Sequence, residues 1–152
     1  MSRTTDFLTC FRRIIKLHEG LLKEQICSKY QLTLMEATII SFLMNNPEKD
    51  TAADIAELRM LSKGNISQGV EGLIQKSLLE RKRDDTDRRR IHLSLTPKAE
   101  PITASMEQIW RLFHDEIFSG LTAEELAMFD KFNGQIMENT KKALADLPQR
   151  KE

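Results

Sequence analysis

Six cationic side chains stand close together near the middle of the chain: Arg81, Lys82, Arg83, Arg88, Arg89 and Arg90. Cations attract nucleic-acid phosphates, and an arginine senses the deepened negative potential of a narrow minor groove. A polar cluster, residues 84–87, separates the two halves of this set. The alternative interpretation is a solvated hairpin whose charges only protect an exposed edge from aggregation.

A second polar stretch, residues 62–68, carries side chains that can bind a duplex. Asn65 and Gln68 can pair bidentately with adenine in the major groove, whereas Ser62 and Lys63 suit phosphates. We expect Lys63, Asn65, Ser67 and Gln68 to share one exposed helix face. The alternative for Asn65 and Gln68 is ordinary surface polarity.

Other chemistries find little support in the sequence. His18, His92 and His114 have no histidine or cysteine three or four residues away, so we expect no metal. No Gly-rich phosphate loop, paired-cysteine motif or Ser-His-Asp arrangement is visible, and we therefore expect neither a cofactor nor an enzyme. Cys10 and Cys27 are interpreted as inert small apolar residues, with a redox-active Cys10 as the open alternative.

Four helices are predicted before the hairpin, and the fourth carries the polar stretch 62–68. Apolar spacing predicts a helix over residues 5–28. Thr33 and Thr51, each with an acidic residue three positions later, form capping boxes that open two more helices. Ser62 opens a fourth, which should turn Ile66, Val70 and Leu73 inward. The short connection between the third and fourth helices predicts a helix-turn-helix.

A β-hairpin and two long helices follow. Alternating Ile91, Leu93 and Leu95 predict a strand that pairs with the segment before the polar cluster. Thr96 as N-cap and Pro97 at the first helical position predict a helix from there to Gly120. A last helix is expected over 122–147. The fold class is therefore mainly α with a small β-hairpin, in the order α-α-α-α-β-β-α-α.

Composition restricts the class of protein further. The 152 residues suit one domain, with 40% hydrophobic residues and two cysteines. No run of 18 apolar residues or signal-peptide pattern is present, so we expect a cytoplasmic protein without membrane contact. The net charge is zero, but residues 59–98 carry ten Lys/Arg against five Asp/Glu. This basic block indicates a local anion-binding surface.

The segment from Asp84 to Lys98 resembles the wing of the MarR family of bacterial transcriptional regulators. The family pattern is Asp-Pro-x-Asp-Arg-Arg, a short strand, then Leu-Thr-Pro-x-Gly. The matching runs are Asp84-Asp85-Thr86-Asp87-Arg88-Arg89 and Leu95-Thr96-Pro97-Lys98-Ala99. Asp85 replaces the usual proline and Ala99 the usual glycine. The order of elements extends the resemblance over nearly the whole chain.

The resemblance implies an obligate homodimer on a pseudo-palindromic DNA operator. It implies that Arg89 enters the minor groove and that Asp87 holds this arginine in position. The residues expected to contact DNA are Ser62, Lys63, Gly64, Asn65, Ser67, Gln68, Lys82, Arg83, Asp87, Arg88, Arg89 and Arg90.

Dimerisation is expected to use the terminal helices. The apolar stripe of the helix after Pro97 is more than a small lobe should cover alone. Contacts are expected at Phe7, Phe11, Ile102, Met106, Ile109, Phe113 and Ile136. The chain is thus predicted to be a single domain (1–152), with a winged-helix DNA-binding lobe (30–98) and dimerisation helices (5–28 and 97–147).

The predicted function is sequence-specific transcriptional regulation, as a repressor. The alternative is a winged-helix module that binds a protein partner without DNA. Family members often accept a small phenolic or anionic lipophilic effector in the crevice beside the DNA-binding lobe, so such an effector stays open here. The other interpretation of the nearby Met35, Phe42, Met44, Phe113 and Phe118 is simple core packing.

Overall fold

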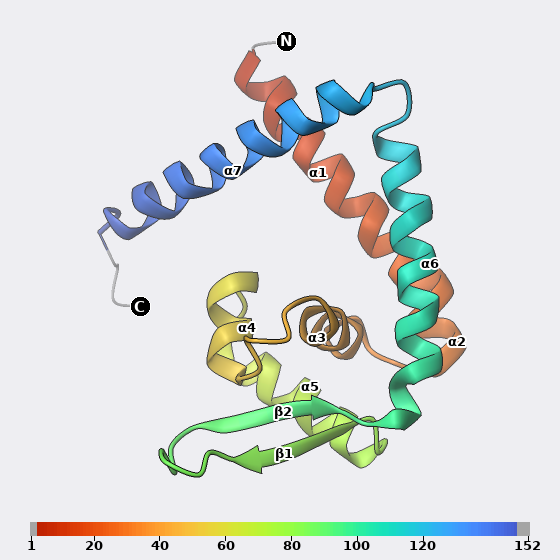
Figure 1. Cartoon of the computed structure of the whole chain (residues 1–152), viewed down its shortest axis with the longest axis vertical. Helices are drawn as coiled ribbons and strands as arrows, with labels where there is room; N and C mark the ends of the chain where they lie inside the picture. The colour runs from red at the N-terminus through yellow and green to blue at the C-terminus, as the bar shows by residue number, and fades with distance from the viewer. Residues whose placement is uncertain (1–2, 149–152) are drawn as a thin grey trace. The chain divides into compact units, whose positions relative to one another are not determined.

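The structure, a computed structural model, describes residues 3–148 (Figure 1). A long N-terminal helical segment comprises α1 (Arg3–Leu22), the π-helical turn η1 (Lys23–Cys27) and α2 (Ser28–Tyr30). The central elements are α3 (Leu34–Asn45), α4 (Ala52–Arg59), α5 (Lys63–Gln75), β1 (Leu79–Arg83) and β2 (Ile91–Leu95). The 3-10 turn η2 (Pro97–Ala99), α6 (Glu100–Ile117) and α7 (Ala123–Ala145) complete the chain. The predicted mainly helical class with one hairpin is confirmed.

Side-chain caps start the helices where the sequence predicted them. The hydroxyls of Thr33, Thr51 and Thr122 each accept a hydrogen bond from the backbone N–H three residues later. The carboxylate of the acidic residue at that position accepts a hydrogen bond from the threonine N–H. Ser62 accepts from the Asn65 N–H at 3.3 Å. These bonds satisfy orphan donors of the first turn, so the boundaries are fixed locally.

The start of α6 differs from the prediction. Thr96 does not cap the helix; its hydroxyl donates instead to the Ser77 carbonyl, at 2.7 Å. Residues Pro97–Ala99 form the 3-10 turn η2, and the α-helix begins only at Glu100. Thr96 and Pro97 thus occupy the predicted N-cap and first helical positions, but the first turn is 3-10 and the Thr96 side chain bonds the segment before β1 instead of capping the helix.

Two glycines let α5 lie very close to α3. A Cβ on Gly69 would come within 2.6 Å of Ile39 Cδ1, and one on Gly72 would overlap the Glu36 carboxylate. Glu36 is buried, bonds the Thr33 N–H and pairs with Lys76 Nζ at 2.6 Å. The atoms that come closest to these two glycines belong to side chains of α3.

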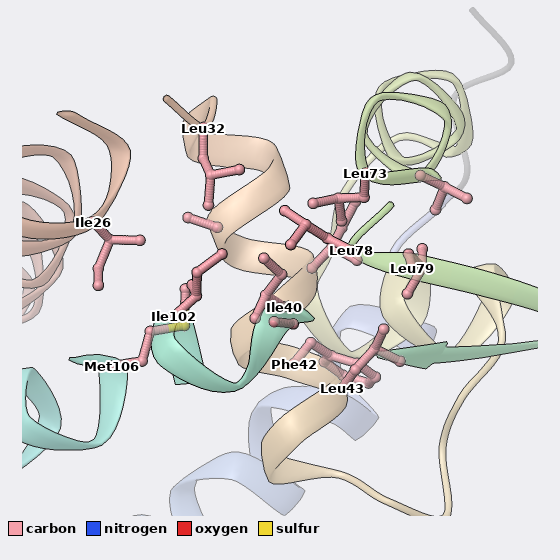
Figure 2. Packing of buried hydrophobic residues seen from close by; sticks show 14 of the residues in the cluster. Ile26, Leu32, Ile40, Phe42, Leu43, Leu73, Leu78, Leu79, Ile102 and Met106 are labelled. Carbon is pink, nitrogen blue, oxygen red and sulfur yellow. The ribbon is translucent and has the colours of Figure 1, made fainter. Parts of the chain in front are cut away.

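A single hydrophobic core supports these elements. Figure 2 shows Ile40, Phe42 and Leu43 of α3 among side chains from α5, the hairpin and α6. Ile66, Val70 and Leu73 of α5 are buried, as predicted. The antiparallel strands pair Leu79 with Leu95, and their register brings the polar segment 84–90 to the tip.

The apolar stripe of α6 is already covered within one chain. Ile102, Met106, Ile109 and Phe113 are each 3–5% exposed. The first three belong to the core, and the Phe113 ring lies 5.2 Å from the His18 ring of α1. The argument that this stripe needs a partner is therefore wrong, because the chain's own helices bury it.

The chain divides into two compact units, residues 1–113 and 114–152. In the second unit Gly120, at φ +85°, lies between α6 and α7, and the Phe118 and Phe129 rings meet at 5.1 Å. None of the described residues of α7 is buried. Within residues 3–148, no helix is long and apolar enough to cross a membrane.

Candidate nucleic-acid interface

The N-terminal half of α5 presents a polar face. Lys63, Gly64, Asn65, Ser67 and Gln68 are all exposed. Ile66 and Val70, on the opposite side of the helix, hold it against the core. The Ser62 cap and the left-handed turn at Met60 (φ 53°) set where this helix begins after α4. The predicted face exists, although its contact with bases stays a prediction.

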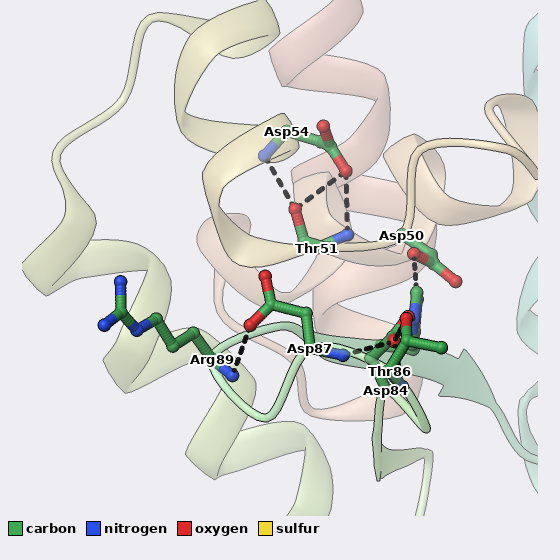
Figure 3. Close-up of polar contacts among 8 residues, drawn as sticks. Asp50, Thr51, Asp54, Asp84, Thr86, Asp87 and Arg89 are labelled. Carbon is green, nitrogen blue, oxygen red and sulfur yellow. Dashed lines mark hydrogen bonds and ion pairs between the residues drawn. The ribbon is translucent and has the colours of Figure 1, made fainter.

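The tip between β1 and β2 is organised by two aspartates (Figure 3). Asp84 Oδ1 accepts from the Thr86 N–H, the Thr86 hydroxyl and the Asp87 N–H, at 2.7–2.9 Å. Asp87 Oδ1 then accepts from the Arg89 backbone N–H at 3.0 Å. Asp87 therefore holds the backbone of Arg89, while the arginine side chain in Figure 3 extends away from it.

Five of the wing cations form no ion pair with the part of the chain that the structure describes. Among residues 3–148, no carboxylate lies within 4.0 Å of the cationic groups of Lys82, Arg83, Arg88, Arg89 or Arg90. All five residues are exposed. Arg81 differs from them, because it pairs with Glu71 of α5. The wing thus offers five uncompensated cations to a polyanion rather than the six counted in sequence.

Sequence reasoning treats His92 only as a candidate metal ligand and misses its contacts with two aspartates at the base of the wing tip. Its Nδ1 lies 2.7 Å from Asp50 Oδ1 and its Nε2 lies 2.8 Å from Asp84 Oδ2. Hydrogen bonds from His92 and from the turn hold the pKa of Asp84 well below its usual range. Bonds to Asp84 and Asp50 raise the pKa of His92 above 6.5. Because Asp84 and Asp50 lie 8 and 42 residues from His92 in the chain, no local sequence pattern indicates this cluster.

The remaining candidate ligands do not assemble. His18, His92 and His114 lie on α1, β2 and α6, and the described residues contain no metal-binding group of three. Burial raises the pKa of the Cys27 thiol, which disfavours the reactive thiolate. Cys10 is exposed.

A cleft of about 970 Å³ opens beside the helix-turn-helix. Its walls come from α1, α3, α4, α6 and the residue Leu61, and they include Met35, His18 and Arg59. The Arg59 guanidinium lies over the Phe42 ring, 5.9 Å from its centroid, and has no carboxylate within 4.0 Å among residues 3–148. Burial, followed by the charge of Arg59, lowers the pKa of His18. Of the residues expected to form core, Phe42 and Phe113 are buried.

The residues predicted to dimerise fall into two groups. Phe7 and Ile136 are exposed, and Phe11 is half-buried. Ile102, Met106, Ile109 and Phe113 are buried in their own chain and present no surface to a partner. Other exposed apolar side chains lie on α1 and α7: Leu8, Ile15, Leu17, Met128, Phe129, Phe132, Met137 and Leu144.

A helix-turn-helix followed by a cationic hairpin defines a winged-helix protein. Residues 30–90, which hold α3, α4, α5, β1 and the tip of the hairpin, match the sequence model of the MarR family. Over this segment the chain is similar to the MarR family of winged-helix transcriptional regulators.

Solved structures share the fold. A MarR transcriptional regulator from Methanosarcina mazei has a TM-score of 0.74 at 18% identity, covering 91% of this chain and 99% of that one. Streptococcus pneumoniae FabT, solved in complex with DNA, gives 0.69 at 22%, covering 93% and 97%. Bordetella bronchiseptica BpsR, whose DNA binding is regulated by 6-hydroxynicotinic acid, gives 0.66 at 18%, covering 87% and 98%.

Proposed function

We propose that this regulator acts as a homodimeric repressor on a pseudo-palindromic duplex. The observation that carries the proposal is the coincidence, on one lobe, of the exposed polar face of α5 and the uncompensated cations of the wing. A helix of this kind fits the major groove, and the wing reaches the adjacent minor groove. FabT, which has the same fold, has been solved in complex with DNA.

Duplex selection tests this proposal directly. The full chain is incubated with a random-sequence duplex pool and with its own promoter region, and bound DNA is sequenced. Enriched sequences should contain two related half-sites centred about 10 base pairs apart. Arg89→Ala should weaken binding, whereas Lys141→Ala on α7 serves as the charge-matched control. Failure to enrich any sequence contradicts the proposal and favours the alternative, in which the lobe binds a protein partner without DNA.

We further propose that the cleft binds an anionic aromatic effector. Arg59 supplies an unpaired cation at the wall, while Ile14, Leu22, Met35 and Phe113 supply apolar surface. A ring carboxylate satisfies both, since a charge-assisted bond to Arg59 is added to apolar burial. BpsR, a protein of the same fold, responds to such a molecule.

Calorimetry with 6-hydroxynicotinic acid and its uncharged amide separates charge from shape. The acid should bind the wild type more tightly than the amide does, and Arg59→Gln should abolish that preference. Arg111→Gln, which changes a cation outside this cleft, should keep it. If acid and amide bind the wild type equally, Arg59 does not select anions.

A further inference from the structure

The cluster at the base of the wing tip joins three separate segments. Asp50 belongs to the loop between α3 and α4, His92 to β2, and Asp84 to the turn after β1. The Leu93 N–H also donates to the Asp50 carbonyl at 2.8 Å, so the loop is bonded to β2 through both backbone and side chain. The three side chains are 22–30% exposed, neither free in solvent nor sealed from it.

The hydrogen bonds continue without a break from this cluster to Arg89. Asp84 uses one oxygen for His92 and the other for the Thr86 and Asp87 amides. Asp87 in turn accepts from the Arg89 N–H. The orientation of the tip backbone is therefore linked, bond by bond, to the loop that precedes the helix-turn-helix. Figure 3 shows Asp50 at one end of this series and Arg89 at the other.

The bonding pattern requires one particular form of the imidazole. Both ring nitrogens face carboxylate oxygens, which only accept hydrogen bonds. A neutral ring has one N–H and one lone pair, so one carboxylate would face a lone pair. The imidazolium has two N–H groups and satisfies both partners.

Other nearby charges are weaker influences on the ring. Lys82 is the cross-strand partner of His92, and its charge opposes protonation. Two carboxylates within 2.8 Å of the ring nitrogens have the opposite effect and lie in direct contact. Charged groups on the adjoining loop, helix and tip that form no ion pair with the ring within 4.0 Å are Lys49, Asp54 and Arg90.

We propose that His92 is a positioning residue for DNA binding, and that its protonated ring locks the wing tip onto the loop between α3 and α4. The lock rests on the proposed function only in that the tip must contact DNA. Because the bonds to Asp84 and Asp50 raise the pKa of His92, the lock is complete below about pH 6.5 and is lost as pH rises through the raised value. Asp84, whose pKa is lowered, stays ionised over this whole range.

Asp50→Asn provides a sharp test. The introduced amide can donate to the neutral ring, whose other nitrogen still donates to Asp84. This variant should therefore keep the lock at high pH. Asp85→Asn is the matched control, because it removes the same charge from a wing residue with no bond to His92.

The first measurement needs no DNA. Nitrogen-15 spectra of the full chain should show both His92 nitrogens protonated near pH 6.5. Exchange of the Thr86 and Asp87 amides should accelerate with pH beyond the intrinsic chemical rate in the wild type and in Asp85→Asn. Asp50→Asn should lack that additional acceleration. A neutral His92 at pH 6.5 overturns the proposal, whether or not the protein binds DNA.

The second measurement uses a duplex selected by the wild type. Affinity should fall about fivefold between about pH 6.5 and about pH 8.5, the effect of losing one partly exposed charge-assisted bond. Asp85→Asn should show the same fall from a higher affinity, and Asp50→Asn should show a flattened profile. Identical pH profiles for all three proteins contradict the positioning role. Absence of any selected duplex contradicts the proposed function alone.

Discussion

For the Asp87 side chain, its negative charge and its hydrogen bond to the Arg89 backbone have opposite expected effects on DNA affinity. Removing a carboxylate near DNA should tighten binding by electrostatics alone. Because Asp87 holds the Arg89 backbone, Asp87→Ala should instead weaken binding, and Arg89→Ala should cost about 1–3 kcal/mol. Fluorescence anisotropy on a selected duplex measures both effects.

Asp85→Ala is the control for that pair, since it removes a wing carboxylate with no such bond, and it should bind as tightly as the wild type or more tightly. Tighter binding by Asp87→Ala would mean that its bond to Arg89 has no positioning role.

The residues of α5 should separate base recognition from phosphate attraction. Asn65→Ala or Gln68→Ala should erase preference at particular base pairs and leave non-specific affinity nearly intact. Lys63→Ala should weaken all sequences alike and reduce the salt slope by about one unit. Titrations of single-base duplex variants at several salt concentrations measure both quantities. Full wild-type discrimination by both amide variants would leave base recognition to the wing.

At the scale of elements, the glycines of α5 offer a matched pair of substitutions. Gly72→Ala forces a methyl group onto the buried Glu36 carboxylate and should lower the free energy of unfolding by about 1–3 kcal/mol. Gly64→Ala meets no atom within 4 Å and should be neutral or raise it by up to about 1 kcal/mol. Urea unfolding at one protein concentration compares them.

An equal loss of stability in both variants would show that helix propensity, rather than contact with Glu36, determines the cost. Lys76 Nζ and the Thr33 N–H both depend on Glu36. The Gly72 variant should therefore also loosen the start of α3, which amide exchange of Glu36 would report.

Sequence reasoning succeeded where the determinants are local. The Thr33 and Thr51 caps act over three residues, and the alternation of Ile91, Leu93 and Leu95 identifies β2 directly. It missed the partner of the Thr96 side chain, because that partner, the Ser77 carbonyl, lies 19 residues earlier. Likewise, the apolar stripe on α6 indicates that this face is covered, but it does not indicate whether the same chain or a partner covers it.

The site was predicted in the same uneven way. The exposed face of α5 and the cations of the wing follow from spacing and residue type. The pairing of Arg81 with Glu71, the placement of Arg59 in the cleft and the partners of His92 depend on tertiary contacts. No periodicity in the sequence encodes such contacts.

At the scale of the whole molecule, we predict a dimer whose contacts include exposed apolar residues of α1 and of α7. Phe7 and Phe132 are 46% and 53% exposed. Sedimentation should give about 35 kDa, twice the 17.6 kDa of one chain. Phe132→Asp should raise the dissociation constant at least about tenfold, because it would place a charge in the apolar contact predicted between the two chains.

Leu58→Asp on α4 serves as the control for that experiment, since Leu58 is similarly exposed but lies on the helix-turn-helix. Its mass in solution should match the wild type. A monomeric wild-type chain that still binds its selected duplex would contradict the dimer.

The absence of buried residues on α7 has a consequence for related regulators that share a cell. In the dimer that we predict, no core packing within the chain constrains the apolar face of this helix, so that face is free to diverge together with the surface of the partner. Two such proteins can therefore become insulated from mixed assembly through changes in α7 alone, while each keeps its own target sequence. Exchanging α7 between them should exchange the choice of partner and leave the choice of DNA where it was.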